Sequence, residues 1–386
     1  MAERAIDPFL NFTEGRMSTI YINSYLQAAA VTYLLRDEFT TDEAAPLTSP
    51  RTCEPGPGTL TKGADASNRF SIASGKLTAS AGNSNYADPF YSFTGQSRAA
   101  GVALVHHLRK LTAKPQTLIG WGINTTPGIG AFIYTGNWES SGFRNFGSGE
   151  PNLILRDFAI NTDYRAAYIL RATGCFTIID GVIQWISSSG NQATLYPVMA
   201  HYSNGVEIDY VRVSQLPSPW ATDYGIADVH ATPGVSATDY TGQADAIIDL
   251  AVTAPASLAG ETGYWFRKQD ATNGYKAYFD SAGAFLVDRY VAGTPTNVVS
   301  VAGVITGSGT RTIRTIADGT ALRFYTLSGT TWTQRGGTIT DSSFSSQTTI
   351  TPFADGSWTG GGGSLGQLDS WPRTLSGAAL AALNAV

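Results

Sequence analysis

The sequence has few of the residues that stabilise small secreted proteins or build metal centres. Among its 386 residues are only two cysteines, Cys53 and Cys175, and four histidines. A secreted domain held together by disulfides normally carries more cysteines, so we expect both thiols to be free, although one bridge between them is not excluded. Neither a cysteine pair at metal-binding spacing nor a His-x-x-x-His motif occurs, which argues against a zinc site.

Charged residues are also scarce. They make up 14% of the chain, which has a net charge of −5, whereas about a quarter is usual for soluble domains. Lys and Arg form no cluster, so we expect no nucleic-acid partner. No apolar run reaches the roughly 18 residues of a membrane span, so we expect no membrane insertion. Residues 1–16 lack the basic-then-apolar order of a signal peptide, which predicts folding in the cytoplasm.

The residues that are abundant favour strands and tight turns. The chain contains 42 Gly, 18 Tyr and 8 Trp, and short apolar runs such as GVALVHHL, AAYILRA and AFLVDRYV alternate with turns rich in Gly, Pro, Ser and Asn. The length allows two domains with separate cores. The pattern therefore predicts an all-β protein of two tandem jelly-roll β-sandwiches with a short N-terminal arm.

The strand-like apolar runs, and the turn-rich segments between them, suggest domain boundaries along the chain. Residues 1–34 are interpreted as an arm that either docks onto a partner or an oligomer, or packs on its own domain. Residues 35–216 form the first predicted sandwich, and 226–386 the second. Between them, residues 217–225 contain two prolines and are interpreted as a linker. GAALAALNAV, at the end of the sequence, is the segment richest in helix formers, and we expect a helix there.

The two halves of the sequence also echo each other. FTIIDGVIQWIS (176–187) aligns with RTIADGTALRFYT (314–326), each consisting of a strand, an Asp-Gly turn and a second strand. VEIDYVRVSQLP (206–217) aligns with SLGQLDSWPRTLS (364–376), which places Asp209 opposite Asp369. The matched pieces occur in the same order in both halves, which supports a duplicated fold.

Two motifs carry a family resemblance. RDEFTTD, starting at Arg36, and EIDYVRV, starting at Glu207, resemble the opening and closing strands of concanavalin A-like jelly rolls. That superfamily includes laminin-G-like modules, legume-type lectins and laminarinase-like glycoside hydrolases. The resemblance covers residues 36–216 and, less clearly, 226–386, and it implies lectin-like sandwiches.

The hydrolases of this superfamily carry an E-x-D-x-x-E motif on one strand. Alternate residues of a strand face the same side, so the motif places an acid and a nucleophile beside one sugar. The comparable string here is Glu207-Ile208-Asp209, and Arg212 stands where the second glutamate would be. The adjacent His106 and His107 should face opposite sides of a strand. We therefore predict that the chain is not an enzyme.

The resemblance also implies a structural Ca²⁺ site, since calcium takes carboxylate and backbone oxygens. In lectin-like proteins an acid near the first strand often shares this ion with an aspartate of the closing strand. The matching residues here are Asp37, Glu38 and Asp209. The alternative is that these acids cap turns and pair with Arg36 or Arg212.

A sugar site would use aromatic faces that stack on pyranose rings, beside polar side chains. The loop-like segments supply these candidates: Tyr86, Trp121, Tyr134, Trp138, Trp265, Tyr275 and Trp332. Trp138 has only small and polar neighbours in GNWESSG, which favours a surface position. The alternative is that most of these side chains belong to the sandwich cores.

These features favour a non-enzymatic virion protein, a head decoration, spike or tail fibre that recognises host surface glycans. Such a protein would be assembled in the host cytoplasm, joined to other particle proteins through its arm as a homo-oligomer, and exposed at the virion surface. A free carbohydrate-binding protein, an inactive relative of glycoside hydrolases and a bacterial surface adhesin are the alternatives.

Overall fold

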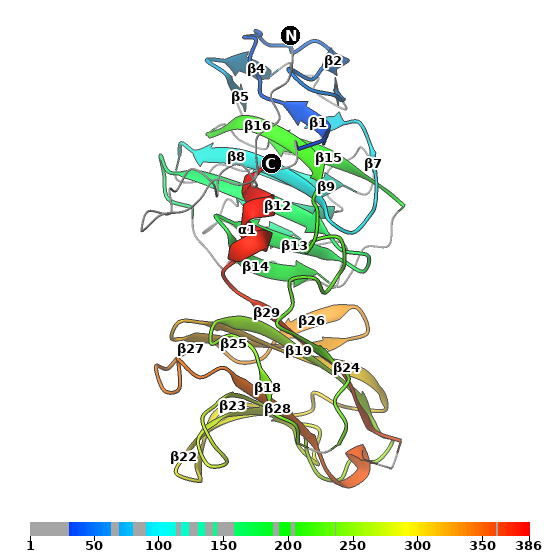
Figure 1. The fold of residues 1–386 in the computed structure, drawn as a ribbon, viewed down its shortest axis with the longest axis vertical. Coiled ribbons are helices and arrows are strands. Elements are labelled where there is room, and N and C mark those ends of the chain that lie inside the picture. Colours follow the sequence, from blue (N-terminus) through cyan, green and yellow to red (C-terminus); the bar gives the residue numbers. More distant parts are fainter. Residues whose placement is uncertain are drawn as a thin grey trace, which may run out of the picture.

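The computed structural model describes residues 31–62, 69–79, 90–112, 117–122, 130–135, 142–144, 158–187, 193–201, 205–235, 237–359 and 362–386. Nearly all of them lie in antiparallel strands or their turns. Figure 1 shows two β-sandwiches following each other along the long axis of the molecule. This arrangement confirms the predicted all-β fold.

The first sandwich consists of two sheets. One contains, in spatial order, β14 (Val182–Ser187), β13 (Cys175–Ile179), β12 (Asp163–Leu170), β8 (Val102–Lys110), β16 (Val206–Gln215), β5 (Lys76–Ala79) and β4 (Phe70–Ala73), and β1 (Tyr33–Asp37) also pairs with β16. The other contains β11 (Gly142–Arg144), β10 (Gly130–Thr135), β9 (Thr117–Gly122), β15 (Thr194–His201), β6 (Phe90–Phe93), β3 (Thr59–Lys62) and β2 (Arg51–Thr52), and β7 (Gln96–Ser97) pairs with β15.

The second sandwich also has two sheets. One contains β17 (Val229–Ala231), β29 (Ser364–Pro372), β19 (Ala246–Ala254), β24 (Gly309–Asp318), β25 (Ala321–Ser328) and β26 (Thr331–Gln334), with β27 (Ile339–Thr340) paired to β25. The other contains β18 (Tyr240–Thr241), β28 (Thr349–Ala354), β20 (Thr262–Lys268), β21 (Gly274–Phe279), β22 (Phe285–Val291) and β23 (Thr294–Val301). A single 3₁₀ turn, η1 (Gly356–Trp358), precedes β29.

The strand orders correct the expected alignment of the two halves. The order β14-β13-β12-β8-β16, with β1 on β16, has its counterpart in β26-β25-β24-β19-β29, with β17 on β29. β16 and β29 therefore match, as expected, but β24 and β25 correspond to β12 and β13 rather than to β13 and β14. The sequence alignment matches the Asp180-Gly181 turn between β13 and β14 with the Asp318-Gly319 turn between β24 and β25. The hairpin that corresponds in strand order, β12–β13, has no Asp-Gly turn.

The two aspartates that the sequence aligns have different strand contacts. Asp369 pairs across strands with His230 on the opening strand β17. Asp209 instead lies at a β-bulge of β16, where the register to β8 shifts. A one-residue bulge changes which side chains are aligned, and the sequence alone does not reveal it.

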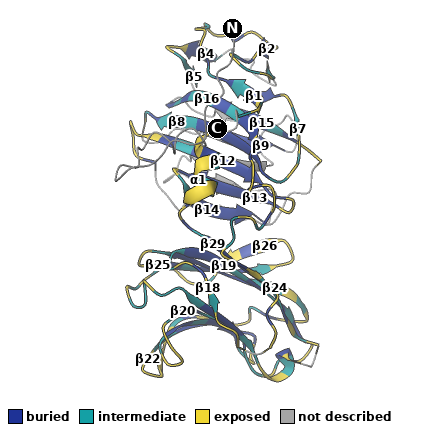
Figure 2. Ribbon diagram, in the orientation of Figure 1, coloured by how far each residue is buried: buried dark blue, intermediate teal, exposed yellow. Residues whose placement is uncertain are grey.

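Each sandwich has its own core between its sheets, and Figure 2 shows the buried residues following the strands. Cys53 and Cys175 are both buried and unpaired, as the sequence favoured. Burial raises the pKa of the Cys175 thiol to about 12, so it stays protonated at neutral pH.

The expected C-terminal helix is present as α1 (Gly377–Asn384), but it packs on the first sandwich. Figure 1 shows it crossing the outer face of the β12-β13-β14 region. Arg165 of β12 donates to the carbonyl of Leu383 at 2.6 Å, and Trp220 donates to that of Ala379 at 3.0 Å. No helix within the described ranges is long and apolar enough to cross a membrane.

The segment between the sandwiches, residues 217–225, is packed rather than extended through solvent. Trp220 is 1% exposed and meets Phe176 edge-to-face at 5.6 Å. The carboxylate of Asp223 accepts hydrogen bonds from the backbone N–H groups of Ala172 and Thr173 in the β12–β13 turn. This segment therefore fixes the first sandwich against the chain that enters the second.

A buried junction joins the sandwiches. Arg314 of β24 lies over the rings of Trp185 and Trp332, 4.2 and 4.1 Å from their centroids. It donates two hydrogen bonds to Asp249, at 2.7 and 2.6 Å. A third goes to the carbonyl of Ile186 in β14, at 2.8 Å. The cation is therefore shared between both sandwiches.

The chain that leaves β29 adds a second connection. Backbone N–H of Ile183 donates to the carbonyl of Arg373 at 2.7 Å, and that of Leu375 donates to the carbonyl of Gly181 at 2.8 Å. The guanidinium of Arg373 also binds Asp318 of the second sandwich, at 3.0 Å. The edge of β14, which would otherwise present unpaired backbone groups, is thus covered by a segment that follows the second sandwich.

We expect Asp249→Ala to destabilise the junction, because it leaves the 1%-exposed Arg314 without its carboxylate. Breaking one partner of a buried ion pair costs about 3–5 kcal/mol. The midpoint of urea unfolding, followed by tryptophan fluorescence, should fall accordingly. The double variant Asp249→Leu/Arg314→Met removes both charges and should recover most of the loss. A single variant as stable as the unmodified chain would contradict this role.

Candidate functional site

One sheet of the second sandwich contains β18, β28, β20, β21, β22 and β23, and we call it the β18–β23 sheet. Its outer face carries four aromatic side chains, Trp265, Tyr278, Tyr290 and Phe353, which we call the aromatic face. Alternation along β20, β21, β22 and β28 directs these four side chains away from the core. Trp265 and Tyr290 are half-buried, and their ring centroids lie 4.7 Å apart. Half-buried rings on an outer sheet face leave surface available to a ligand.

Gly263 allows two of these rings to approach each other. It lies between Tyr278 and Phe353 in the cross-strand row, and the two ring centroids are 6.4 Å apart. A Cβ at Gly263 would come within 2.1 Å of the carbonyl oxygen of Ala277, so no larger residue fits.

Polar groups lie among the rings. The Tyr278 hydroxyl donates to Asp288 at 2.7 Å, and Asn297 donates to the other oxygen of that carboxylate at 2.8 Å. Burial, together with the adjacent Asp288, raises the pKa of Tyr278, so the phenol stays protonated. Lys276 lies 4.4 Å from the centroid of the Tyr278 ring and forms an ion pair with Glu261. The face therefore combines stacking surfaces with hydrogen-bonding groups, the composition of a carbohydrate platform.

Of the four rings, only Trp265 is among the sugar-binding candidates predicted from the sequence. A signal for two others was nevertheless available. In GYKAYF, Lys276 and Tyr278 share one strand face, and in FLVDRYV so do Asp288 and Tyr290. Phe353 was harder to predict, because no sequence rule places its strand β28, which contains Pro352, beside β20. Pairing these two strands, β21 and β22, as a hairpin brings Lys276, Tyr278, Asp288 and Tyr290 together on one face.

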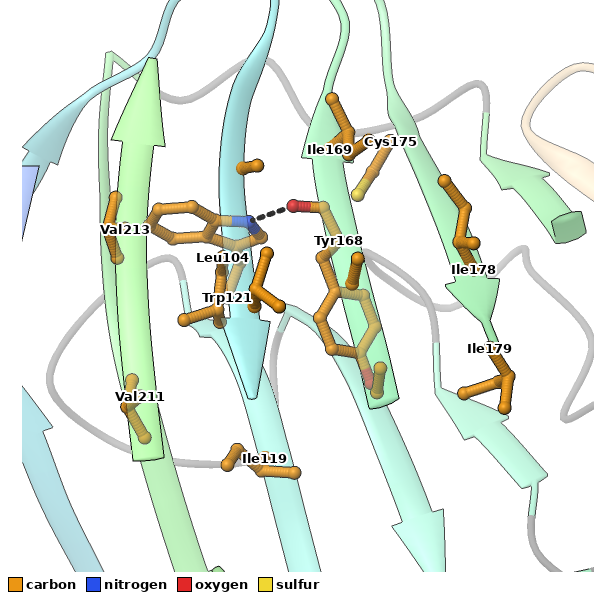
Figure 3. Close-up of a cluster of buried hydrophobic side chains, with 14 of the residues drawn as sticks. Leu104, Ile119, Trp121, Tyr168, Ile169, Cys175, Ile178, Ile179, Val211 and Val213 are labelled. Carbon is orange, nitrogen blue, oxygen red and sulfur yellow. Dashed lines mark hydrogen bonds between the residues drawn. The ribbon is translucent and has the colours of Figure 1, made fainter. Parts of the chain in front are cut away.

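Three other predicted sugar-binding residues are buried, which corrects their assignment. Trp121 is 0% exposed, and its indole N–H donates to the carbonyl of Tyr168 at 3.3 Å inside the first core (Figure 3). Tyr275 is 0% exposed and stacks on Phe266 in the second core. Trp332 is 4% exposed at the junction. Large aromatic area is more stabilising when removed from water, and none of these three rings lies on an outer surface that could stack on a glycan.

The remaining aromatic candidates cannot be placed. Tyr86 and Trp138 lie outside the described residues. Tyr134 falls within β10 (Gly130–Thr135), and only its backbone position is described.

The residues predicted to bind Ca²⁺ face different surroundings. Asp37 is fully buried, and its carboxylate accepts the backbone N–H of Phe39 at 3.0 Å, capping a turn. Glu38 accepts from Arg36 at 2.7 Å and from Arg212 at 2.7 and 2.8 Å. Burial alone would raise the pKa of Glu38, but these two arginines outweigh it and lower the pKa. The geometry corresponds to the alternative of turn capping and arginine pairing.

Asp209 is engaged elsewhere. His107 lies 2.5 Å from one of its oxygens, and Lys76 lies 3.4 Å from the other and 3.1 Å from Glu207. His106 is fully buried whereas His107 is partly exposed, so the two histidines face opposite sides as expected. Across the parts of the chain that the structure describes, no group of three or more His, Cys, Asp or Glu side chains is arranged to hold a metal ion.

No protein family and no curated protein sequence matches the chain. Solved structures with a similar fold include an endo-acting O-glycanase of the human gut microbiota described as initiating mucin breakdown, with 15% identity over 48% of this chain and 100% of that chain, at a TM-score of 0.34. A pseudo beta-1,3-glucanase of Mycobacterium tuberculosis, an immunostimulatory antigen, shares 13% identity over 47% of this chain and 98% of its own, at a TM-score of 0.33.

A third similar structure is LamAcat from Zobellia galactanivorans, with 13% identity over 48% of this chain and 98% of its own, at a TM-score of 0.32. In each case the match spans about half of the present chain. At this level of identity the activities of those proteins do not transfer to this one.

We expect EDTA to leave the thermal unfolding midpoint unchanged, because the carboxylates of Glu38 and Asp209 are already paired with protein cations. A bound Ca²⁺ at a hundredfold excess over its Kd would add about 2.7 kcal/mol, or roughly 5–10 °C for a domain of this size. Melting curves in EDTA and in millimolar CaCl₂ test this. A rise of that size with calcium, reversed by EDTA, would establish the metal site instead.

Proposed function

We propose that the chain is a non-enzymatic, glycan-recognising component of a virion, and that the aromatic face is its carbohydrate-binding surface. The observation that carries the proposal is the grouping of Trp265 and Tyr290, with half-exposed rings, beside Asp288 and Asn297 on one open sheet face. Stacking supplies affinity for the apolar side of a pyranose, and the polar groups orient its hydroxyls.

The non-enzymatic part is supported by the state of the acids on β16. Glycoside hydrolysis needs two carboxyl groups available on either side of the scissile bond. Lys76 bridges Glu207 and Asp209, and Arg212, which replaces the second glutamate of the hydrolase motif, is bound to Glu38. These charges therefore stabilise the sheet rather than serve as an acid and a nucleophile.

The virion part is supported by the junction. Particle appendages must hold their receptor-binding surfaces in a fixed direction. Arg314, which is paired with Asp249 and bound to the carbonyl of Ile186, would serve that need by joining the sandwiches without a flexible linker. The alternative, a free carbohydrate-binding protein, shares the aromatic face but has no requirement for assembly through the predicted arm, residues 1–34.

Glycan recognition can be measured by affinity electrophoresis in gels that contain laminarin, gastric mucin or bacterial capsular polysaccharide. We expect at least one of them to retard the full chain, and Trp265→Ala to weaken binding about tenfold, the loss expected for one stacking contact. Val235→Ala, at a 51% exposed site away from the face, is the control and should bind normally. Retardation by none of the three, or no effect of Trp265→Ala, would refute the site.

The same polysaccharides distinguish binding from hydrolysis. Incubation with the protein should release no reducing ends. Release that disappears in Glu207→Gln would place the chain among the hydrolases.

Assembly into a particle can be tested with antibodies against the chain. We expect them to label purified virions in electron micrographs. A variant that lacks residues 1–30, most of the predicted arm (1–34), should be absent from particles while both sandwiches still unfold at their usual midpoints. Normal incorporation of that variant would exclude the arm as the docking segment. Absence of the intact chain from particles would favour the free carbohydrate-binding protein.

A further inference from the structure

A polar cavity lies at the junction, separate from the aromatic face. Its volume is about 140 Å³, and its wall is formed by Arg171 of the first sandwich together with side chains of β19, β24, β25, β26 and β29 in the second. Ligand sites often occur at such contacts between domains, where two rigid surfaces form a concave wall.

The floor of this cavity is the outer face of the other sheet of the second sandwich, which contains β17, β29, β19, β24, β25, β26 and β27 and is called the β17–β27 sheet. Asp249 aligns across strands with Asp369 on one side and with Arg314 on the other. In the neighbouring row Ala251 aligns with Thr312, and that row continues to Leu327. One row of the floor is therefore charged, and the adjacent row is mostly apolar.

The first sandwich supplies the opposite wall through its β12–β13 turn. Arg171, 6% exposed, lies in this turn, and its guanidinium carbon is 5.4 Å from the centroid of the Trp371 ring. Its carbonyl accepts two hydrogen bonds from Arg98, at 3.3 and 3.2 Å, which hold the turn in place. Neither sandwich alone would enclose the cavity.

The two carboxylates that face the cavity are paired with protein cations, whereas Arg171 forms no ion pair within the described residues and donates to the carbonyl of Ser187 at 3.4 Å. Asp249 is bound bidentately by Arg314, and Asp369 is paired with His230 at 2.6 Å. Carboxylates neutralised in this way are poor ligands for a metal ion but still accept hydrogen bonds from hydroxyl groups. The half-buried Thr312 and Gln367 add further polar atoms, and Leu327 and Trp332 add apolar surface.

We propose that this cavity is a second carbohydrate site, which takes a single neutral pyranose unit and is completed only when both sandwiches meet. A neutral polyhydroxylated ring matches a wall with paired carboxylates, a guanidinium donor, hydroxyl acceptors and an apolar row. The volume accommodates a small ring rather than an extended chain. The site consists of different residues from the aromatic face, so it can be tested independently of the proposed function.

Filling the cavity while leaving its charged groups in place tests the site. Ala251→Leu places a larger side chain among the lining residues, and Thr312→Leu does so from the neighbouring strand. Ala251→Ser is the matched control that leaves the space open. Trp265→Ala removes a ring of the aromatic face and leaves the junction intact. The probes are methyl α-D-glucopyranoside, methyl α-D-galactopyranoside and methyl α-D-mannopyranoside at millimolar concentration.

Saturation-transfer NMR and tryptophan fluorescence of the full chain report binding. We expect at least one probe to bind, to bind about tenfold more weakly in Ala251→Leu and Thr312→Leu, and to bind normally in Ala251→Ser and Trp265→Ala. If Ala251→Leu does not fold, Thr312→Leu decides. Binding of none of the probes, or unchanged binding in the filled variants, overturns the site. Binding lost only in Trp265→Ala places the sugar on the aromatic face alone, which overturns the junction site and leaves the proposed function standing.

Discussion

The rest of the structure depends on one buried cation. Removing the Arg314 guanidinium from water is costly, and three kinds of contact offset that cost: two hydrogen bonds to Asp249, two aromatic faces, and one carbonyl of β14. These partners come from both sandwiches. Asp249 and Trp332 lie in the second sandwich with Arg314, and Trp185 and Ile186 lie in the first. The cation is therefore fully compensated only when the two sandwiches are docked, which makes the junction specific as well as stable.

Docking through a sheet face changes what the outer surfaces of the sandwiches can do. The outer face of the β17–β27 sheet is buried against the first sandwich, and α1 covers part of the outer face of the β12–β14 region. The outer face of the β18–β23 sheet stays open. Aromatic residues occur on covered and open faces alike, and only their position separates a packing role, as for Trp332, from a surface role, as for Trp265.

The closing segment of the chain links the two sandwiches in a further way. After β29 the backbone pairs with the edge of β14, and α1 then packs over β12. The first sandwich is thus completed by residues that follow the second. Deleting or replacing the second sandwich would consequently expose the edge and face that this segment covers.

The sequence by itself determined the fold class, the free cysteines, the C-terminal helix and the opposite orientations of His106 and His107. These features follow from local rules, namely period-two alternation, turn residues and helix propensity. Trp265 was one of seven aromatic residues that the sequence suggested as sugar-binding candidates, and the sequence did not distinguish it from the others. The match between the closing strands β16 and β29 was visible too, because both are long runs at corresponding places.

Only the tertiary structure decided which aromatic rings are open, how the sandwiches dock and where α1 packs. Trp121, Trp265 and Trp332 all lie on strands, and each strand offers two faces of which either can be buried. Glu38 and Asp209 likewise became partners of Arg212, Lys76 and His107 through cross-strand register and a β-bulge. Such contacts join residues more than a hundred positions apart, and local sequence patterns carry no information about them.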